Sequence, residues 1–268
     1  MNSNKSALVF CLVGLSSLVN LPSLAFGISP IKVYFEKGSS SRDVTLDNAE
    51  DKTVRLKVQA YKWTEDGDGK RQLTPTQEIA VFPAILELKS KSKRIIRLAS
   101  KLPPKQIEQS YRLTIEQLPE AVVKKPEATP DGAKPTSATA QLNFLYTLNL
   151  PVFINPINID RKSSLTSPSI NGGNLSFNLV NQGNAHIFAS VIEVTTKDSA
   201  GKAIATKKID PTYVLPSIQR KLVLNLPQDR CQNARSVSIE VKGDEDVGSK
   251  TNLSQTVNVA SGVCSGKK

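Results

Sequence analysis

Residues 141–156 read QLNFLYTLNLPVFINP, and the remainder of the chain is best understood from this stretch. A period of two predicts a β-strand with one apolar face. The alternation continues well beyond the usual strand length of about 5–6 residues, so we expect an unusually long strand. Its large apolar side chains recur at every second position: Leu142, Phe144, Tyr146, Leu148, Leu150, Val152 and Ile154.

Pro151 interrupts the hydrogen-bonding capacity of this strand. Proline has no N–H to donate to a neighbouring strand, which places the predicted strand at or near the edge of a sheet. A long apolar edge strand tends to pair with other chains. Two interpretations follow: the strand is covered inside its own fold, or its presentation to another protein is its function.

Residues 1–25 have the pattern of a secretory signal peptide. Lys5 gives a positive start, residues 7–15 are apolar, and Ser23-Leu24-Ala25 forms a small-x-small cleavage site. The apolar run stops well short of the roughly 20 residues that a membrane-spanning helix needs. We therefore expect an exported chain that starts near Phe26 and does not insert stably into a membrane.

Almost every later segment reads as a short strand followed by a turn. Strands spaced in this way predict β-sandwiches, and the 268-residue chain has room for two domains of about 100–150 residues. We expect an all-β protein with one domain over residues 26–155 and a second over 156–268. A Pro-, Ala- and Lys-rich loop over residues 119–140 leads into the long strand, and no segment has a helical period.

Two cysteines remain after the predicted cleavage, Cys231 and Cys264, because Cys11 lies in the signal peptide. In an oxidising compartment an even pair is typical of one disulfide. Their separation does not match a C-x-x-C redox motif, so we expect a structural bridge within the second domain.

The chain carries a net charge of +11. Its basic residues are spread out and are not interleaved with aromatic residues, which argues against nucleic-acid binding. Arg97 and Arg112 are different because each lies inside an apolar strand, where an unpaired charge is costly. Each therefore needs a partner, either an acidic residue of the same domain or a carboxylate from another protein.

No catalytic pattern accompanies these features. The one histidine, His186, follows a turn and is expected to make structural hydrogen bonds, and with two cysteines it cannot form a metal cage. Phosphate-binding, dinucleotide-binding and nucleophile-elbow motifs are absent from the sequence. An exported hydrolase would need paired carboxylates in a cleft, and nothing marks such a pair. We expect no enzyme activity, metal or cofactor.

Several stretches resemble segments of the periplasmic pilus chaperones of the PapD-like superfamily. They are SPIKVYFEKG (29–38), FPAILELKSKSKRIIRL (82–98), SYRLTIEQLP (110–119), LNLPVFINP (148–156) and NQGNAHIFASVIEV (181–194). The enlarged loop before LNLPVFINP is most similar to the archaic or long-loop branch. The resemblance implies two immunoglobulin-like domains at an angle, a periplasmic location, and capture of pilus or fimbrial subunits for an outer-membrane usher.

In this family the long strand completes the unfinished sandwich of a subunit, so the resemblance implies donor residues Leu142, Phe144, Tyr146, Leu148 and Leu150. The subunit's C-terminal carboxylate is anchored by basic residues in the cleft between the domains. One of these corresponds to Lys32.

The second basic residue of the anchor usually lies near the end of the long strand, where this sequence has Pro151. We therefore take Arg97 and Arg112 as candidate replacements. The competing interpretation is a two-domain structural or adhesive surface protein whose long strand is buried in its own sheet. The sequence leaves open whether a free chaperone caps its own strand by forming an oligomer.

Overall fold

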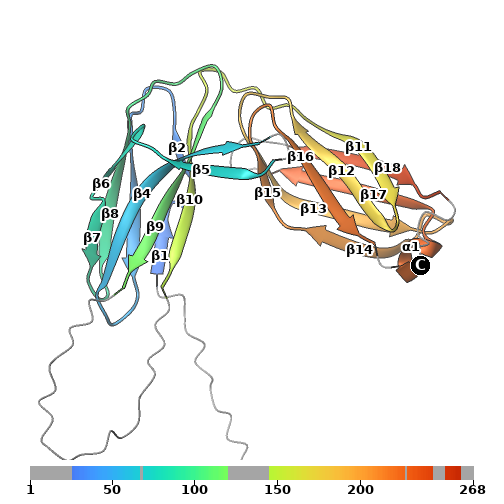
Figure 1. Cartoon of the computed structure of the whole chain (residues 1–268), viewed down its shortest axis with the longest axis horizontal. Helices are drawn as coiled ribbons and strands as arrows, with labels where there is room; N and C mark the ends of the chain where they lie inside the picture. Colours follow the sequence, from blue (N-terminus) through green and yellow to red (C-terminus); the bar gives the residue numbers. More distant parts are fainter. Residues whose placement is uncertain (1–25, 67–68, 120–144, 227, 244–250, 261–268) are drawn as a thin grey trace, which may run out of the picture.

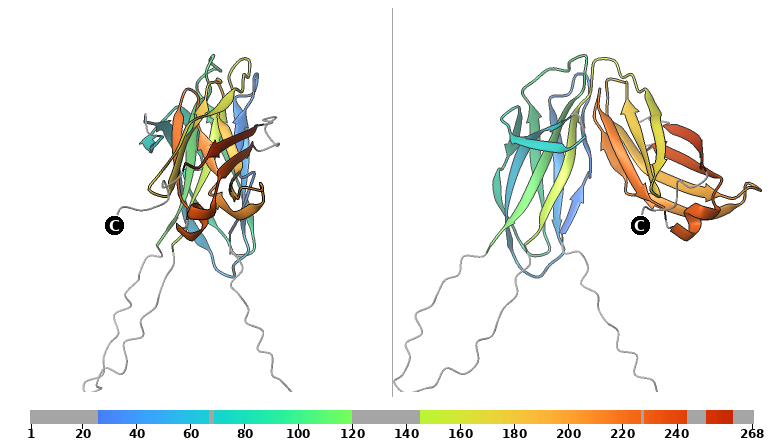
Figure 2. Two further views of the ribbon diagram at one scale, coloured as in Figure 1. Left: turned by 90° about the vertical axis from the view of Figure 1, so that its right-hand side faces the viewer. Right: turned by 45° about the vertical axis from the view of Figure 1, so that its right-hand side comes forward.

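The computed structural model describes residues 26–66, 69–119, 145–226, 228–243 and 251–260. It contains two β-sandwich domains set at an angle to each other (Figure 1), which confirms the predicted all-β fold. Two further views show that the sandwiches meet at one end of the first domain (Figure 2). The predicted signal peptide, most of the 119–140 loop, and residues Leu142, Phe144 and Cys264 lie outside the described residues.

The first domain packs two sheets face to face. One sheet has the order β1-β3-β8-β6 and the other β2-β10-β9-β4-β5, with β7 paired to β4. The bounds are β1 Phe26–Ser29, β2 Val33–Phe35, β3 Ser41–Asn48, β4 Val54–Glu65, β5 Arg71–Pro75, β6 Ile79–Phe82, β7 Ile85–Leu88, β8 Lys93–Ser100, β9 Gln109–Leu118 and β10 Thr147–Ile154.

The second domain has sheets of order β11-β12-β16 and β14-β13-β17-β18, with β15 paired to β13. The bounds are β11 Ser163–Asn171, β12 Asn174–Asn181, β13 Ile187–Lys197, β14 Ala203–Ile209, β15 Thr212–Val214, β16 Gln219–Asn225, α1 Gln228–Asn233, β17 Ser236–Gly243 and β18 Asn252–Asn258. The short helix α1 corrects the expectation that no helix would form. Its six residues are too few to show a helical period in the sequence.

Alternation builds the core of each domain. In β4, Val54, Leu56, Val58 and Ala60 point into the first sandwich and are buried, while Arg55 and Lys57 face solvent. Separate clusters of buried apolar residues fill the first and second sandwiches. Each domain therefore has its own core, as expected from the period-two pattern.

The first strand differs from the prediction. The alternating residues 28–35 predict one strand, but the structure divides them between β1, which pairs with β3, and β2, which pairs with β10 in the other sheet. Pro30 has no N–H for a ladder, and Ile31 beside it is exposed. This break places Lys32 between the two strands, at the point where the chain changes sheets.

Candidate functional site

The apolar face of β10 leaves the core of its own sandwich toward its N-terminal end. Val152 and Ile154 are 1% exposed and Leu150 is 4% exposed, whereas Tyr146, on the same face, is 45% exposed. Leu148 lies between these extremes and packs against the edge of the core. Together, Tyr146 and Leu148 line a small apolar hollow at the end of the sandwich. Of the predicted donor residues that the structure describes, Tyr146 is exposed, Leu148 is half-buried, and Leu150 lies in the core of its own domain.

The backbone edge of β10 is also partly open. On one side, β10 pairs with β9 along its whole length, from Thr147 to Ile154. On the other side, β2 pairs only with Val152, Phe153 and Ile154. Among the described strands none pairs with the second edge over residues 147–151, so this edge can accept a further strand. The edge position expected from Pro151 is confirmed for this part of the strand.

Arg112 projects from β9 into the seam between the domains. Its side chain is 6% exposed overall, and its Cζ lies 3.9 Å from the ring centre of Trp63 and 5.3 Å from that of Tyr213. The Nε donor is buried and has no hydrogen-bond partner among the described residues. Burial, followed by repulsion from Arg71, lowers the pKa of Arg112 to about 10. Burial disfavours the charged form of the guanidinium, and an anion in this seam would stabilise that form.

Lys32 reaches the same aromatic group from the connection between β1 and β2. Its Nζ lies 4.7 Å from the ring centre of Phe188, and Phe188 lies 4.4 Å from Tyr213. Tyr213 in turn contacts Arg112. The structure therefore brings two of the three predicted anchor residues onto one set of aromatic rings contributed by the second domain.

Arg97 lies elsewhere, on the outward face of β8. It donates hydrogen bonds of 2.9 and 3.0 Å to the two carboxylate oxygens of Asp43, directly opposite it on β3. This hydrogen-bonded pair is solvent-exposed and holds the pKa of Asp43 below its ordinary value. Arg97 thus has the acidic partner that the sequence required, and the structure does not bring it together with Lys32 and Arg112.

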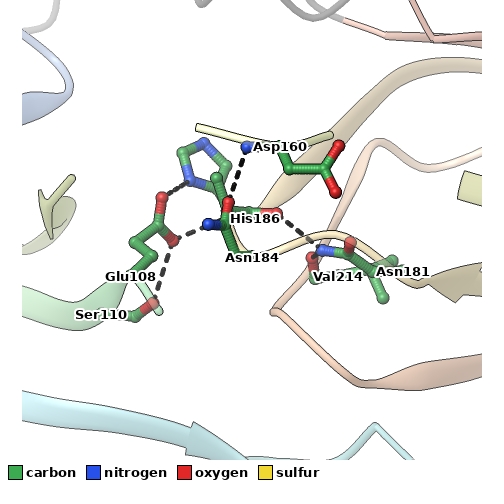
Figure 3. Close-up of polar contacts among 8 residues, drawn as sticks. Glu108, Ser110, Asp160, Asn181, Asn184, His186 and Val214 are labelled. Atoms are coloured by element: carbon green, nitrogen blue, oxygen red, sulfur yellow. Dashed lines mark hydrogen bonds and ion pairs between the residues drawn. The ribbon is translucent and has the colours of Figure 1, made fainter. Parts of the chain in front are cut away.

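Two polar contacts fix the seam that contains these cations. Glu108 of the first domain accepts hydrogen bonds from His186 Nδ1 (2.7 Å), the His186 backbone N–H (3.2 Å) and Ser110 Oγ (3.2 Å), as Figure 3 shows. Both side chains are buried, and the imidazole stacks on Phe153 at 3.7 Å between ring centres. His186 therefore makes the structural hydrogen bonds expected of it.

A neighbouring amide reinforces this contact. Asn184 donates to the carbonyls of Gln106 (2.9 Å) and Asn158 (2.7 Å) and accepts from the backbone of Asp160 (2.7 Å; Figure 3). It thereby ties the segment before β9 to the connection between the domains. This arrangement limits the freedom of the two domains around the anchor residues.

The second polar contact joins Glu65, at the end of β4, to Arg220 of β16. The Glu65 side chain is fully buried, and its desolvation raises its pKa despite the nearby Arg220. Arg220 also donates to the backbone carbonyl of Tyr213 at 3.0 Å. The β4–β5 hairpin is therefore held against the second domain, which it approaches in Figure 1.

Within the described ranges no group of three or more His, Cys, Asp or Glu residues could hold a metal ion. No helix in the described part of the chain is long and apolar enough to cross a membrane. Cys231 is buried and disulfide-bonded. Its pairing with Cys264 stays a prediction, because Cys264 lies outside the described residues. At the seam the carboxylates of Glu108 and Glu65 are engaged by His186 and Arg220, whereas Arg112 Nε has no hydrogen-bond partner among the described residues, which suits an anionic ligand.

The sequence matches the profile described as pili and flagellar-assembly chaperone, PapD N-terminal domain, over residues 25–160. That match covers more than half of the chain. The chain belongs to this chaperone family. Membership of this family gives it the role of a pilus-assembly chaperone, which is a non-enzymatic role.

Solved structures share the fold of this PapD-like chaperone. One is CsuC–CsuE, a chaperone–tip adhesion subunit pre-assembly complex from the archaic chaperone–usher Csu pili of Acinetobacter baumannii. Its matching chain has a TM-score of 0.56 and 18% identity, covering 86% of this chain and 97% of that one.

The chaperone YadV has a TM-score of 0.54 and 15% identity, covering 88% of this chain and 100% of its own. The class 5 fimbriae chaperone CfaA has a TM-score of 0.51 and 18% identity, covering 86% and 98%. At these identities the likeness establishes the two-domain immunoglobulin-like fold. A comparison with curated protein sequences finds no match.

Proposed function

We propose that this protein is a periplasmic chaperone that captures pilus subunits by donating β10 to them and then delivers them to an outer-membrane usher. In this account residues 1–25 direct export, and the domains extend over residues 26–155 and 156–268. The observation that carries the proposal is the state of β10. Its apolar face leaves the core at Leu148 and Tyr146, and no described strand pairs with its second edge over residues 147–151.

Donation of this strand has a clear energetic basis. An incomplete subunit would cover Tyr146, Leu148 and the preceding apolar residues of the same face, Phe144 and Leu142. Each such burial stabilises the complex by about 1.5–3 kcal/mol. Backbone hydrogen bonds along residues 147–151 would add about 0.5–1.5 kcal/mol each. The same contacts keep the subunit's apolar groove away from other unfinished subunits.

The carboxylate anchor would fix the register between the subunit and β10. Lys32 and Arg112 converge on the aromatic rings at the seam, where a C-terminal carboxylate of the subunit would form charge-assisted hydrogen bonds. Arg97 is excluded from this anchor because Asp43 occupies its guanidinium on the other sheet. A carboxylate fixed at the seam would determine which subunit residues face Tyr146 and Leu148.

The test compares two substitutions on neighbouring residues. Tyr146 and Leu145 are 45% and 52% exposed, but alternation places them on opposite faces of the strand. We expect Tyr146→Asp to abolish recovery of a subunit with the tagged chaperone expressed in its own host. Leu145→Asp, the matched control, should keep most of it. Equal recovery with both variants would contradict capture by this face.

A further inference from the structure

A second arginine shares the ring on which Arg112 rests. Trp63 of β4 is 2% exposed, and Arg71 Cζ lies 5.5 Å from its ring centre, compared with 3.9 Å for Arg112 Cζ. Arg71 is the first residue of β5 and lies directly opposite Glu65 in the hairpin ladder. The hairpin therefore places the exposed guanidinium of Arg71 near the same ring as the buried guanidinium of Arg112.

These like charges are near enough to oppose each other. After burial, Arg71 is the main influence that lowers the pKa of Arg112. The acidic group facing both arginines is Glu65, but its Oε1 binds Arg220 and its own pKa is raised by burial. Glu65 thus compensates the two charges only in part. A second carboxylate beside Arg71 and the ring of Trp63 would offset this repulsion.

The seam has space for such a group. A hollow of about 190 Å³ is lined by Trp63, Glu65, Arg71, Thr212, Tyr213 and Arg220. A water molecule in the liquid takes up about 30 Å³, so a carboxylate with its flanking atoms fits this volume. Arg112 does not line this hollow; it lies next to it, against the rings of Trp63 and Tyr213, which do.

We propose that Arg71 is a further cation of the carboxylate anchor, acting beside Arg112 at the ring of Trp63. The inference rests on the proposed capture of a subunit's C-terminal carboxylate. The β4–β5 hairpin thereby adds a strong cation to the two, Lys32 and Arg112, that the proposed function already places at the seam. Lys32 then contributes from the far side of Tyr213 and Phe188.

The chain offers a built-in reporter, because Trp63 is its single tryptophan. The probe is N-acetyl-alanyl-phenylalanine with a free carboxylate, and its C-terminal amide is the control ligand. Binding is followed by the indole N–H cross-peak of Trp63 in nitrogen-15 NMR spectra. We expect the carboxylate form to shift this cross-peak in a saturable way and the amide form to leave it in place.

Variants then separate Arg71 from the rest of the site. Arg71→Gln should weaken binding of the carboxylate probe by about tenfold, the value of one charge-assisted hydrogen bond. Arg71→Lys should recover part of that loss because it restores the charge. Arg55→Gln is the matched control: Arg55 is an exposed arginine of β4 near Glu87, away from the seam, and should bind as the unmodified protein does.

Two outcomes would overturn the inference in different ways. If Arg71→Gln binds the probe as tightly as the unmodified protein while Arg112→Gln does not, Arg71 is outside the anchor and the proposed function stands. If neither form of the probe shifts the Trp63 cross-peak in the unmodified protein, no carboxylate anchor exists at Trp63. Strand capture would then be judged from the Tyr146 and Leu145 variants alone.

Discussion

Arg112 of β9 lies directly opposite Pro151 of β10 in the antiparallel ladder. Side chains of directly opposed residues project from the same face of a sheet. Arg112 therefore occupies, from the neighbouring strand, the side of the sheet that a basic residue at position 151 would take. Proline is tolerated there because β2 begins to pair with β10 only at Val152.

This pairing predicts that a basic residue at position 151 can partly replace Arg112. Arg112→Ala should weaken subunit capture at least tenfold, since it removes a charge-assisted hydrogen bond. Adding Pro151→Lys in the same chain should restore part of the capture, because the new ammonium group enters the seam from the facing position. Affinity of purified variants for the recovered subunit provides the measurement, with Arg97→Ala as a control that should behave normally. A double variant as weak as Arg112→Ala would argue against this exchange of positions.

Burial increases along the long strand from Tyr146 to Leu150. We expect the loss of unfolding free energy on substitution to increase in the same direction. Leu150→Ala should lower the free energy of unfolding by about 2–5 kcal/mol, because it leaves a cavity in the first core. Tyr146→Ala should change it by only about 0.5 kcal/mol, since that side chain is largely exposed. Urea unfolding of the free protein measures both. A large loss of stability at Tyr146 would show that this residue belongs to the chaperone's own core.

Removal of the buried carboxylate at the seam should loosen the two domains. Glu108→Ala leaves His186 Nδ1, the His186 backbone N–H and Ser110 Oγ without their acceptor. Each buried donor left without an acceptor costs about 1–3 kcal/mol. Calorimetry should show a lower unfolding temperature, and small-angle scattering should show a wider range of domain angles. A variant with unchanged values for both would mean that Glu108 does not hold the seam.

Tyr111 predicts a specific alkaline instability. Burial and its hydrogen bond to Glu78 Oε2 (2.9 Å) raise its pKa well above the ordinary value near 10. The unfolded chain therefore loses this proton first, so the stability from Tyr111 is complete below about pH 10 and falls as pH rises further. The slope of one such group is about 1.4 kcal/mol per pH unit. Tyr111→Phe should make the stability curve flatter above pH 10; an unchanged slope would refute this linkage.

The sequence predicted the parts of the fold that depend on local alternation. The apolar face of β10, the open edge at Pro151 and the two sandwiches follow from period two and from proline's missing N–H. The division of residues 28–35 between two strands could not be predicted in this way. One run of alternating residues forms both β1 and β2, although these strands pair in different sheets. Which sheet a strand joins depends on distant partners.

The anchor residues also could not be identified from local sequence patterns alone. Arg97 and Arg112 are embedded alike in apolar strands, yet only Arg112 faces the second domain. Nothing local distinguishes them, because the difference lies in which sheet carries each strand. Trp63 and Tyr213 meet at 5.5 Å between ring centres although they come from different domains. An aromatic site built across such a separation in sequence leaves no pattern within either segment.

The most direct test of strand donation is amide hydrogen exchange over residues 145–151, in the free protein and in the complex recovered from its own host. We predict fast exchange at the open-edge amides of the free protein, in contrast to the protected residues Val152 and Ile154. In the complex these amides should become protected, because the subunit pairs with the same edge. Strong protection of the open-edge amides in the free monomer would contradict the account and show that this edge of the strand is already covered within its own fold.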